Sequence, residues 1–469
     1  MRRRRRIVAM ALALAAISLP AAAQQPTSQV EKQRAAVLQA YGGAYQGPLT
    51  AYVARVGERM AQAAGQGGRC RFTVLDTPVV NAMAVPPGCE IYITRGLLTL
   101  IRDEDELAAV VGHEVGHVAA NHAGRRQTRT AVTGIGALIL GAVTGSSTVA
   151  NIASQVGQLN VLSYSRDQEY DADRLSVGYL TSASYSAYGL PDMLSALQAN
   201  DQVEALDRSN DAKATPVWSR THPLTGARIA RAVAGARAAG PRRPPPRAPD
   251  PYLAAVDGLT CGDDPAQGVV LGRRFLHPDI GVGFTAPEGF QLANSPSAVT
   301  LQGPGGQVAQ FAGGGRGGDL SDDANAVLRQ VTGQAQVAAG EPQRTRINGL
   351  EAVVLPAQAR TSRGDVDVTV AAYAVGARPY YFVTMAPSGQ GRAFDGLIGS
   401  MHRLSDAERA EARPRRVRVV TVRPGDSVDT FAARMAVPDH SRERFLAING
   451  LQSGDVIRPG DRVKIVSLP

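Results

Sequence analysis

The chain has 469 residues, of which 44% are hydrophobic and 19% are charged, so it can build about two to four packed domains and is not a disordered protein. The formal charge is +9, but Arg2–Arg6 carry five of these positive charges at the very start. The rest of the chain is nearly balanced. The high pI therefore does not indicate nucleic-acid binding, and we expect no nucleic-acid partner.

The beginning of the chain has the pattern of an export signal. Arg2–Arg6 are followed by a short apolar run, Ile7–Leu19, and then by small residues that end at Ala23. This order predicts a cleavable signal peptide at 1–23 and a periplasmic protein, possessing at most peripheral contact with the membrane or cell wall. An uncleaved anchor is the alternative, although the run is shorter than the roughly 20 residues that span a bilayer.

Residues 24–239 are predicted to form one domain, mainly α-helical with a small β-sheet. Apolar spacing near 3.6 predicts helices within 27–66, and two β-like runs begin at Cys70 and Cys89. In an oxidising compartment these two cysteines either form a disulfide between neighbouring strands or remain thiols, and the spacing does not decide which. Cys261 is the third and last cysteine.

The segment Asn81-Ala82-Met83-Ala84 lies between the two runs and leads into a proline-rich turn, so we expect it to be an edge strand. Acidic residues at 103–106 then predict the start of a helix that continues to about Asn121. Further helices are expected at 167–179, 190–206 and 226–238.

Residues 131–163 are apolar but rich in glycine, alanine, serine and threonine. We interpret them as a pair of helices or a lid near the functional site. Contact with a membrane is the alternative, which the glycines and polar residues weaken.

The remaining chain divides at two stretches of linker composition. Residues 240–260 are predicted to be a proline-rich linker and 405–416 a basic linker. Between them, alternating runs interrupted by two helical segments predict an α+β domain on an antiparallel sheet at 261–404. A compact β-α-α-β unit is expected at 417–469.

Gly112-His113-Glu114-Val115-Gly116-His117 is the central motif. On a helix, residues four positions apart share a face, so His113 and His117 can bind one metal ion. This HExxH pattern is typical of zinc proteases, in which the glutamate, here Glu114, is the general base. The alternative is two solvated histidines on a surface helix.

A catalytic zinc needs a third protein ligand. We expect Glu169 to supply it, because Glu169 and Asp173 share one face of the helix predicted at 167–179. Asp173 would then accept the free N–H of His113. The alternative is an exposed acidic face paired with neighbouring arginines. His122 does not fit the metzincin spacing, so we interpret it as a surface histidine.

These motifs together resemble the gluzincin family that holds the CaaX prenyl proteases, the HtpX-type membrane proteases and the periplasmic BepA-type proteases. The resemblance rests on the HExxH segment, on Ser165-Arg166-x-x-Glu169-x-x-Ala-Asp173 and on Thr221-His222-Pro223 with Arg228. It implies one Zn²⁺ per chain and substrate binding along Asn81, Ala82, Met83 and Ala84. It also implies that His222 approaches the zinc, as a fourth ligand in a resting state or as an oxyanion partner; a structural histidine is the alternative.

Residues 417–466 resemble a lysin motif, through Val422-Arg-Pro-Gly-Asp-Ser and Ile457-Arg-Pro-Gly-Asp. The resemblance implies binding to peptidoglycan; a domain that packs on the protease is the alternative. The strand and helix order of 261–404 resembles PsbP-like domains, and a scaffold or substrate-recruiting role is expected there.

These patterns predict an exported zinc endopeptidase that cleaves unfolded or misassembled envelope proteins in quality control. A peptidoglycan-tethered chaperone or binding protein with a self-inhibited metal site is the second interpretation. A peptidoglycan hydrolase is a weaker third, since the zinc motif resembles that of protein-cleaving enzymes.

Overall fold

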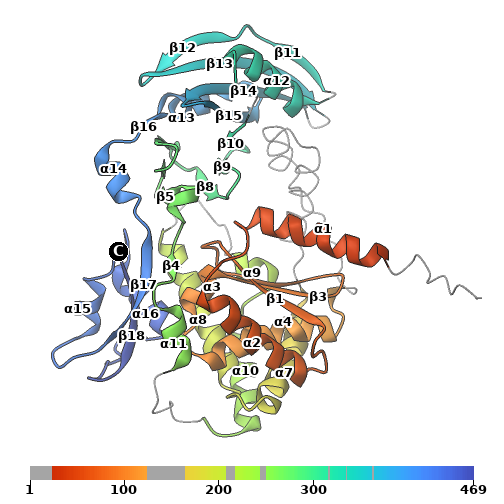
Figure 1. Cartoon of the computed structure of the whole chain (residues 1–469), viewed down its shortest axis with the longest axis vertical. Helices are drawn as coiled ribbons and strands as arrows, with labels where there is room; N and C mark the ends of the chain where they lie inside the picture. The colour runs from red at the N-terminus through yellow and green to blue at the C-terminus, as the bar shows by residue number, and fades with distance from the viewer. Residues whose placement is uncertain are drawn as a thin grey trace, which may run out of the picture.

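The computed structural model describes residues 24–123, 164–207, 217–242, 250–314, 317–333, 335–361 and 364–469. Figure 1 shows a helical unit, a β-rich middle unit set apart from it, and a small C-terminal unit that lies against the helical unit. The expected signal peptide at 1–23 and the segment 131–163 lie outside the described residues. In the part of the chain that is described, no helix has the length and apolar content to cross a membrane.

The helical unit is built around a buried helix that is covered by other helices and by one small sheet. The elements are α1 Gln24–Ala40, α2 Pro48–Ala63, β1 Cys70–Leu75, β2 Ala82–Val85, β3 Cys89–Thr94, α3 Arg95–Leu100, α4 Glu104–Ala119, α7 Arg166–Ser182, α8 Gly189–Asp207, α9 Val217–Thr221 and α10 Gly226–Ala239. The core includes residues from α2, β3, α4 and α8. The predicted helices and strands of this part are present, but α4 ends at Ala119 and not at about Asn121, and the short helices α3 and α9 were not predicted.

The sheet of the helical unit has the order β1-β3-β2. β3 pairs in parallel with β1 and antiparallel with β2, so β2 is an edge strand, as expected. A disulfide joins Cys70 to Cys89, the first residues of β1 and β3, with their Cα atoms 4.5 Å apart. The disulfide interpretation therefore holds in this structure, while Cys261 is free.

α4 begins where the sequence predicts it. The Asp103 side chain caps the helix by accepting a hydrogen bond of 2.8 Å from the Glu106 N–H, and three acidic residues fill the first turn. α7 packs closely on α4 because two glycines lie at the contact. A Cβ at Gly112 would lie 2.9 Å from Ser176 Oγ, and one at Gly116 would lie 3.3 Å from the Ala172 oxygen. The two glycines therefore allow α7 to bring its acidic face beside the histidines of α4.

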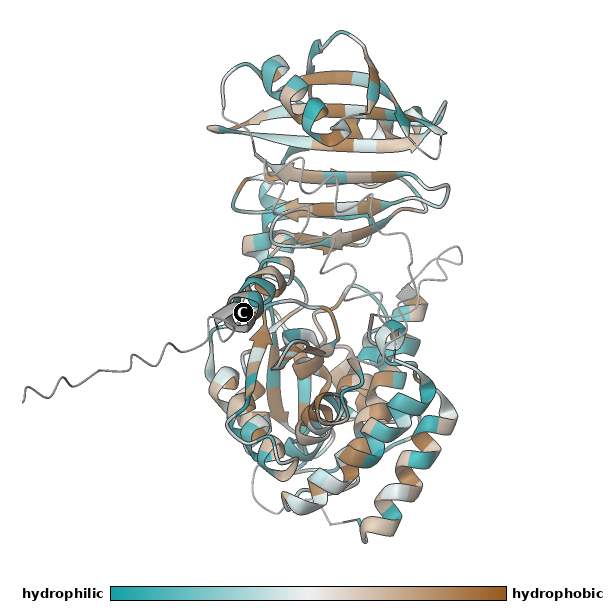
Figure 2. Ribbon diagram, turned by 90° about the vertical axis from the view of Figure 1, so that its right-hand side faces the viewer, coloured by the Kyte–Doolittle hydropathy of each residue, from teal (hydrophilic) through white to brown (hydrophobic). Residues whose placement is uncertain are grey.

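The middle unit has two antiparallel sheets. The larger has the order β11-β13-β14-β15-β10-β9-β8, with β12 also paired to β13, and the smaller has the order β16-β7-β6-β5. α12 covers one face of the larger sheet, and the smaller sheet and α13 cover the other, which gives two apolar layers (Figure 2). The elements are η3 Pro265–Gln267, β5 Val269–Leu271, β6 Arg274–His277, β7 Val282–Thr285, β8 Gln291–Asn294, β9 Val299–Gln302, β10 Val308–Gly313, α12 Leu320–Thr332, β11 Gln336–Ala339, β12 Gln343–Ile347, β13 Leu350–Thr361, β14 Gly364–Val375, β15 Arg378–Pro387, η4 Gly391–Phe394, α13 Asp395–Gly399 and β16 His402–Arg403.

The C-terminal unit has the predicted β-α-α-β order: β17 Arg415–Thr421, α15 Val428–Ala432, α16 Ser441–Asn449 and β18 Arg462–Ser467. It does not stand apart from the helical unit. The buried Lys464 ammonium of β18 donates hydrogen bonds to the backbone oxygens of Thr99, Leu100 and Ile101 at 2.7, 3.1 and 2.5 Å. These oxygens lie at the end of α3, where helix carbonyls lack partners within the helix.

The stretches expected to be linkers are partly folded. Within 240–260, α11 Pro251–Val256 is capped by Asp250, and the buried Tyr252 hydroxyl donates to the Leu98 oxygen. β4 Thr260–Cys261 then pairs with β17. α11 and β4 have a structural role. Arg95 of α3 donates a hydrogen bond to the Thr260 oxygen at 2.6 Å, which fixes this segment to the helical unit.

The basic stretch 405–416 is also ordered. α14 Asp406–Glu411 begins with a capping box at Ser405, and β17 already starts at Arg415. Composition alone suggested a linker because arginine and proline are common in exposed segments. The buried contacts that order both stretches come from residues far away in the sequence.

Candidate metal centre

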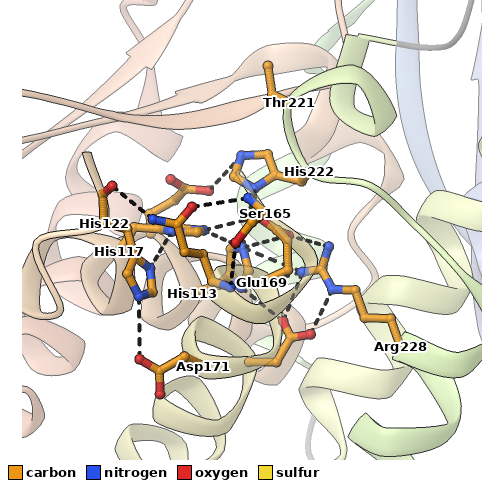
Figure 3. Close-up of polar contacts among 12 residues, drawn as sticks. His113, His117, His122, Ser165, Glu169, Asp171, Thr221, His222 and Arg228 are labelled. Atoms are coloured by element: carbon orange, nitrogen blue, oxygen red, sulfur yellow. Dashed lines mark hydrogen bonds and ion pairs between the residues drawn. The ribbon is translucent and has the colours of Figure 1, made fainter. Parts of the chain in front are cut away.

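Four potential ligands meet at the centre of the helical unit (Figure 3). His113 and His117 come from α4, Glu169 from α7, and His222 from the residue that follows α9. All four are almost completely buried, and one ligand atom of each lies within 4.8 Å of those of the others. The structure thus brings together the two imidazoles and the carboxylate predicted from the sequence, together with the histidine that the resemblance indicated.

The donor atoms have the spacing of a tetrahedral zinc site. His113 Nε2 lies 3.0 Å from His117 Nε2 and 3.3 Å from His222 Nδ1. Glu169 Oε1 lies 3.1 Å from His222 Nδ1 and 3.4 Å from His117 Nε2. Tetrahedral bonds of 2.0–2.1 Å place ligand atoms about 3.3 Å apart. Three nitrogens and one carboxylate oxygen at these separations fit zinc.

The buried charges around the donors also fit a divalent cation. Glu114, Glu169 and Asp173 are buried carboxyl groups, and one buried guanidinium, that of Arg228, lies among them. Ionised, the three carboxylates exceed the guanidinium by two negative charges. Buried charge is costly unless it is compensated, and a divalent cation would balance this excess.

The pKa values follow from the same arrangement. Burial raises the pKa of Glu169, but the charges of His222 and Arg228 outweigh it and hold that pKa well below its usual range. Burial lowers the pKa of His117 well below its usual value. A carboxylate and a neutral imidazole are the forms that bind a metal.

Asp173 lies where the sequence analysis expected it. Its Oδ1 is 2.9 Å from His113 Nδ1, which leaves Nε2 of that ring facing the other donors. Arg228 of α10, to which the sequence analysis gave no role, donates to both oxygens of Asp173 at 2.7 and 2.8 Å and pairs with Glu169 at 2.5 Å. The guanidinium therefore holds the metal-facing carboxylate and the carboxylate behind His113 in fixed positions.

His122 is not a surface histidine, so that prediction is wrong. It is 2% exposed, and its Nδ1 lies 2.9 Å from Nδ1 of His117. α4 ends at Ala119, and Asn121 adopts a left-handed conformation (φ 51°) that turns the chain back, while the His122 N–H donates to the His117 oxygen. An asparagine after the last helical turn is the sequence signal for this C-terminal motif.

Replacing His122 with leucine should weaken metal binding by roughly 10–100-fold, because the imidazole of His117 loses the partner that orients it. Glutamine at the same position can still hydrogen-bond and should lose less affinity. Competition with a zinc chelator measures both variants. Equal affinity of the leucine variant and the wild type would exclude this orienting role.

Two aromatic rings, also not anticipated, pack on the histidines. Tyr164 stacks on His117 with ring centres 3.6 Å apart, and Trp218 stacks on His222 at 4.4 Å. No short sequence motif predicts that Tyr164 or Trp218 packs on a histidine. Both reduce the freedom of an imidazole to turn away from the centre.

Glu114 lies next to the four donors without a firm partner. Neither of its carboxylate oxygens has a hydrogen-bond partner among the described residues, and Oε1 lies 3.6 Å from His222 Nε2. A buried carboxylate without partners is costly. A water molecule beside the metal would satisfy it, as expected for a general base.

The expected substrate strand also lies near the centre. β2 contains Ala82, Met83 and Ala84 and contacts α4. Asn81 precedes it and is 1% exposed, and its side-chain oxygen lacks a partner within the described part of the chain. An exposed strand edge can pair with an extended peptide.

Comparison with known proteins agrees with this geometry. Residues 49–235 match the family model of peptidase family M48, and residues 420–466 match that of the LysM domain. The chain contains an M48 peptidase domain and a LysM domain. All four donors, Glu114, Asp173 and Arg228 lie within the matched M48 domain.

Part of the chain is also similar to curated proteins. The beta-barrel assembly-enhancing protease of Escherichia coli (strain K12) is 26% identical over 192 residues, which cover 39% of this chain and 38% of the relative. The mitochondrial metalloendopeptidase OMA1 of Schizosaccharomyces pombe is 30% identical over 140 residues, covering 29% of this chain and 41% of the relative. The chain thus spans about two-fifths of the length of these relatives.

One solved structure with similarity to this chain is a PsbP protein, the family that the middle unit was expected to resemble. The solution structure of cyanobacterial PsbP from Synechocystis sp. PCC 6803 covers 28% of this chain and 91% of its own, at 12% identity and a TM-score of 0.24. That score is too low to assign a fold, so the PsbP-like character of the middle unit stays a prediction.

Proposed function

We propose that this chain is a zinc-dependent endopeptidase in which His113, His117 and Glu169 hold the metal and Glu114 is the general base. The convergence of two imidazoles and one carboxylate, buried beside the unpartnered carboxyl of Glu114, carries the proposal. The M48 match supports peptide bonds as the substrate. Bound zinc would supply Lewis acidity and lower the pKa of a water molecule to about 7.

The protein groups around the metal would then move the proton and hold the substrate. Glu114 takes the proton of the attacking water and passes it to the leaving amine. Asp173 and His122 keep the ligating imidazoles in position from behind. The peptide lies along Asn81, Ala82, Met83 and Ala84 and pairs with the edge of β2 that has no strand partner among the described residues.

Removing the metal should abolish proteolysis. Casein cleavage by the purified chain is expected to stop with a chelator and to return when Zn²⁺ is added, because the proposed chemistry requires the cation. Fluorescent casein measures both steps. Cleavage that persists after complete removal of metal would exclude a metallopeptidase.

The position of His222 favours a closed resting state, which deepens the second interpretation of the sequence. Its Nδ1 is one of the four converging donors, and stacking on Trp218 holds the ring there. Closed four-ligand sites are typical of structural zinc, whereas catalytic zinc keeps one position open. We infer that His222 must move aside before substrate is cleaved.

Replacing His222 with alanine should therefore increase casein cleavage several-fold at unchanged zinc content, because a coordination position opens. Turnover together with metal analysis tests this. A strong decrease in turnover with zinc retained would instead assign His222 to the stabilisation of the oxyanion.

The cellular role is also proposed. The signal-like residues 1–23 support export to the periplasm, and the LysM match supports attachment to peptidoglycan through 417–469. The name of the bacterial relatives supports envelope proteins, unfolded or misassembled, as substrates. A pull-down on purified peptidoglycan tests the attachment, and cell fractionation tests the location. The proposed units are the protease at 24–239, the middle domain at 261–404 and the LysM-like domain.

A further inference from the structure

Helices α8 and α16 lie side by side where the peptidase domain meets the LysM domain (Figure 1). A groove is lined by residues of both domains at this place. Its cavity volume is about 640 Å³. One wall is a single face of α8 that includes Ser195, Gln198 and Gln202, and the other includes Gln452 and Ser453, which follow α16. The groove is therefore composite, since neither domain forms it alone.

The two walls are fixed relative to each other at the base of the groove. Arg102 donates to the Gly450 oxygen at 3.5 Å and also pairs with the buried Glu106. Gly450 has φ 60°, and a Cβ there would overlap the Arg102 guanidinium, so this close approach requires glycine. The Lys464 contact with the end of α3 lies beside it. The groove is a product of the docked arrangement.

The lining suits a neutral, hydroxyl-rich ligand. Amides and hydroxyls dominate the exposed rim, and Leu206, which is 53% exposed, adds apolar surface at one end. Two ion pairs lie at the groove, Asp192 with Arg242 at 2.6 Å and Arg102 with Glu106, and the exposed carboxylate of Glu443 also lines it. An anionic ligand would be repelled by Glu443 and would find no unpaired cation in the described lining, whereas sugar hydroxyls and acetamido groups find hydrogen-bond partners and apolar contact.

We propose that this groove binds a chain of N-acetylhexosamine units and that helix α8 of the peptidase domain forms one of its walls. The inference rests on the proposed glycan attachment of the LysM domain and goes further, because it assigns part of the recognition to the peptidase. A glycan bound there touches a helix that packs directly on α4, the helix of His113 and His117. The catalytic centre is thereby held at a set orientation to the cell wall.

The test uses the whole chain and a bulky side chain in the peptidase wall. Gln198→Trp places an indole in the groove from an exposed position, and Ala205→Trp places the same side chain on an exposed part of α8 outside the lining. Binding is measured with chitohexaose by calorimetry and with purified peptidoglycan by sedimentation. Thermal unfolding verifies that both variants are folded.

We expect Gln198→Trp to weaken binding at least roughly tenfold, through lost hydrogen bonds and blocked space, and Ala205→Trp to change it less than about twofold. If Gln198→Trp loses binding to peptidoglycan and neither protein binds chitohexaose, the inference is supported and the ligand is the cell-wall polymer. If the wild type binds and Gln198→Trp binds equally well, α8 does not form a wall of the glycan site, although glycan attachment by the LysM domain still stands. Absence of wild-type binding to either probe overturns both.

Discussion

Replacing Glu114 with glutamine should reduce peptide hydrolysis by roughly 10²–10⁴-fold while leaving the metal in place. Glutamine has the same shape as glutamate but cannot accept a proton, and general acid–base catalysis contributes roughly 10²–10⁴-fold. The three proposed ligands keep their contacts, because Glu114 has no hydrogen bond to them in the described structure. Casein turnover and metal analysis of the same preparation measure both effects.

The contrasting variant is Glu169→Ala, which removes a proposed ligand from the same buried centre. It should bind zinc more weakly and lose activity, because only the three histidines remain as donors, whereas Glu114→Gln should lose activity alone. The pair therefore separates the base from the ligand set. Unchanged turnover in Glu114→Gln would rule out the proposed base, and an unchanged zinc affinity of Glu169→Ala in competition with a chelator would rule out the proposed ligand.

The sequence predicts those parts of this site that depend only on neighbouring residues. The spacing of His113 and His117 places them on one helical face, and the acidic start of α4 and the serine cap of α7 mark where these helices begin. Glu169 and Asp173 follow from the same periodicity. Each inference needs only a few neighbouring residues, because helix geometry is the same wherever the helix packs.

The parts that the sequence does not predict depend on how elements meet. Arg228 reaches Asp173 from 55 positions away, and only the packing of α10 on α7 brings it there. His122 contacts His117 because α4 ends two residues earlier than expected. With the helix continued to Asn121, the same histidine would point elsewhere, so a small error at a helix end reversed the interpretation of a buried residue.

For the LysM domain, too, the sequence predicts the local structure but not how the domain packs on the rest of the chain. The sequence predicts its β-α-α-β order, because the repeated Arg-Pro-Gly-Asp turns and the apolar runs are local. Its position is set by contacts such as that of Lys464 with Thr99, which are 365 residues apart. A linker composition at 240–260 suggested independence, but α11 and β4 bury part of that segment between the two domains.

Replacing Lys464 with methionine should lower the stability of the docked pair of domains by about 2–3 kcal/mol. Methionine fills a similar volume but leaves the oxygens of Thr99, Leu100 and Ile101 without their donor, and unpaired buried acceptors and lost charged hydrogen bonds cost this much. A lower thermal midpoint and faster tryptic cleavage near Arg416 are the expected results, because undocking exposes the start of β17, which now pairs with β4.

Lys464→Arg should also destabilise, because the planar guanidinium does not fit three oxygens that converge on one ammonium. Most of the other basic residues are arginines, so a lysine here fits a geometric requirement. Lys32→Met is the matched control: it removes an exposed lysine and should leave the thermal midpoint and the rate of tryptic cleavage unchanged. If Lys464→Met melts and resists trypsin like this control, the docking does not depend on the buried ammonium, and the groove between α8 and α16 has another support.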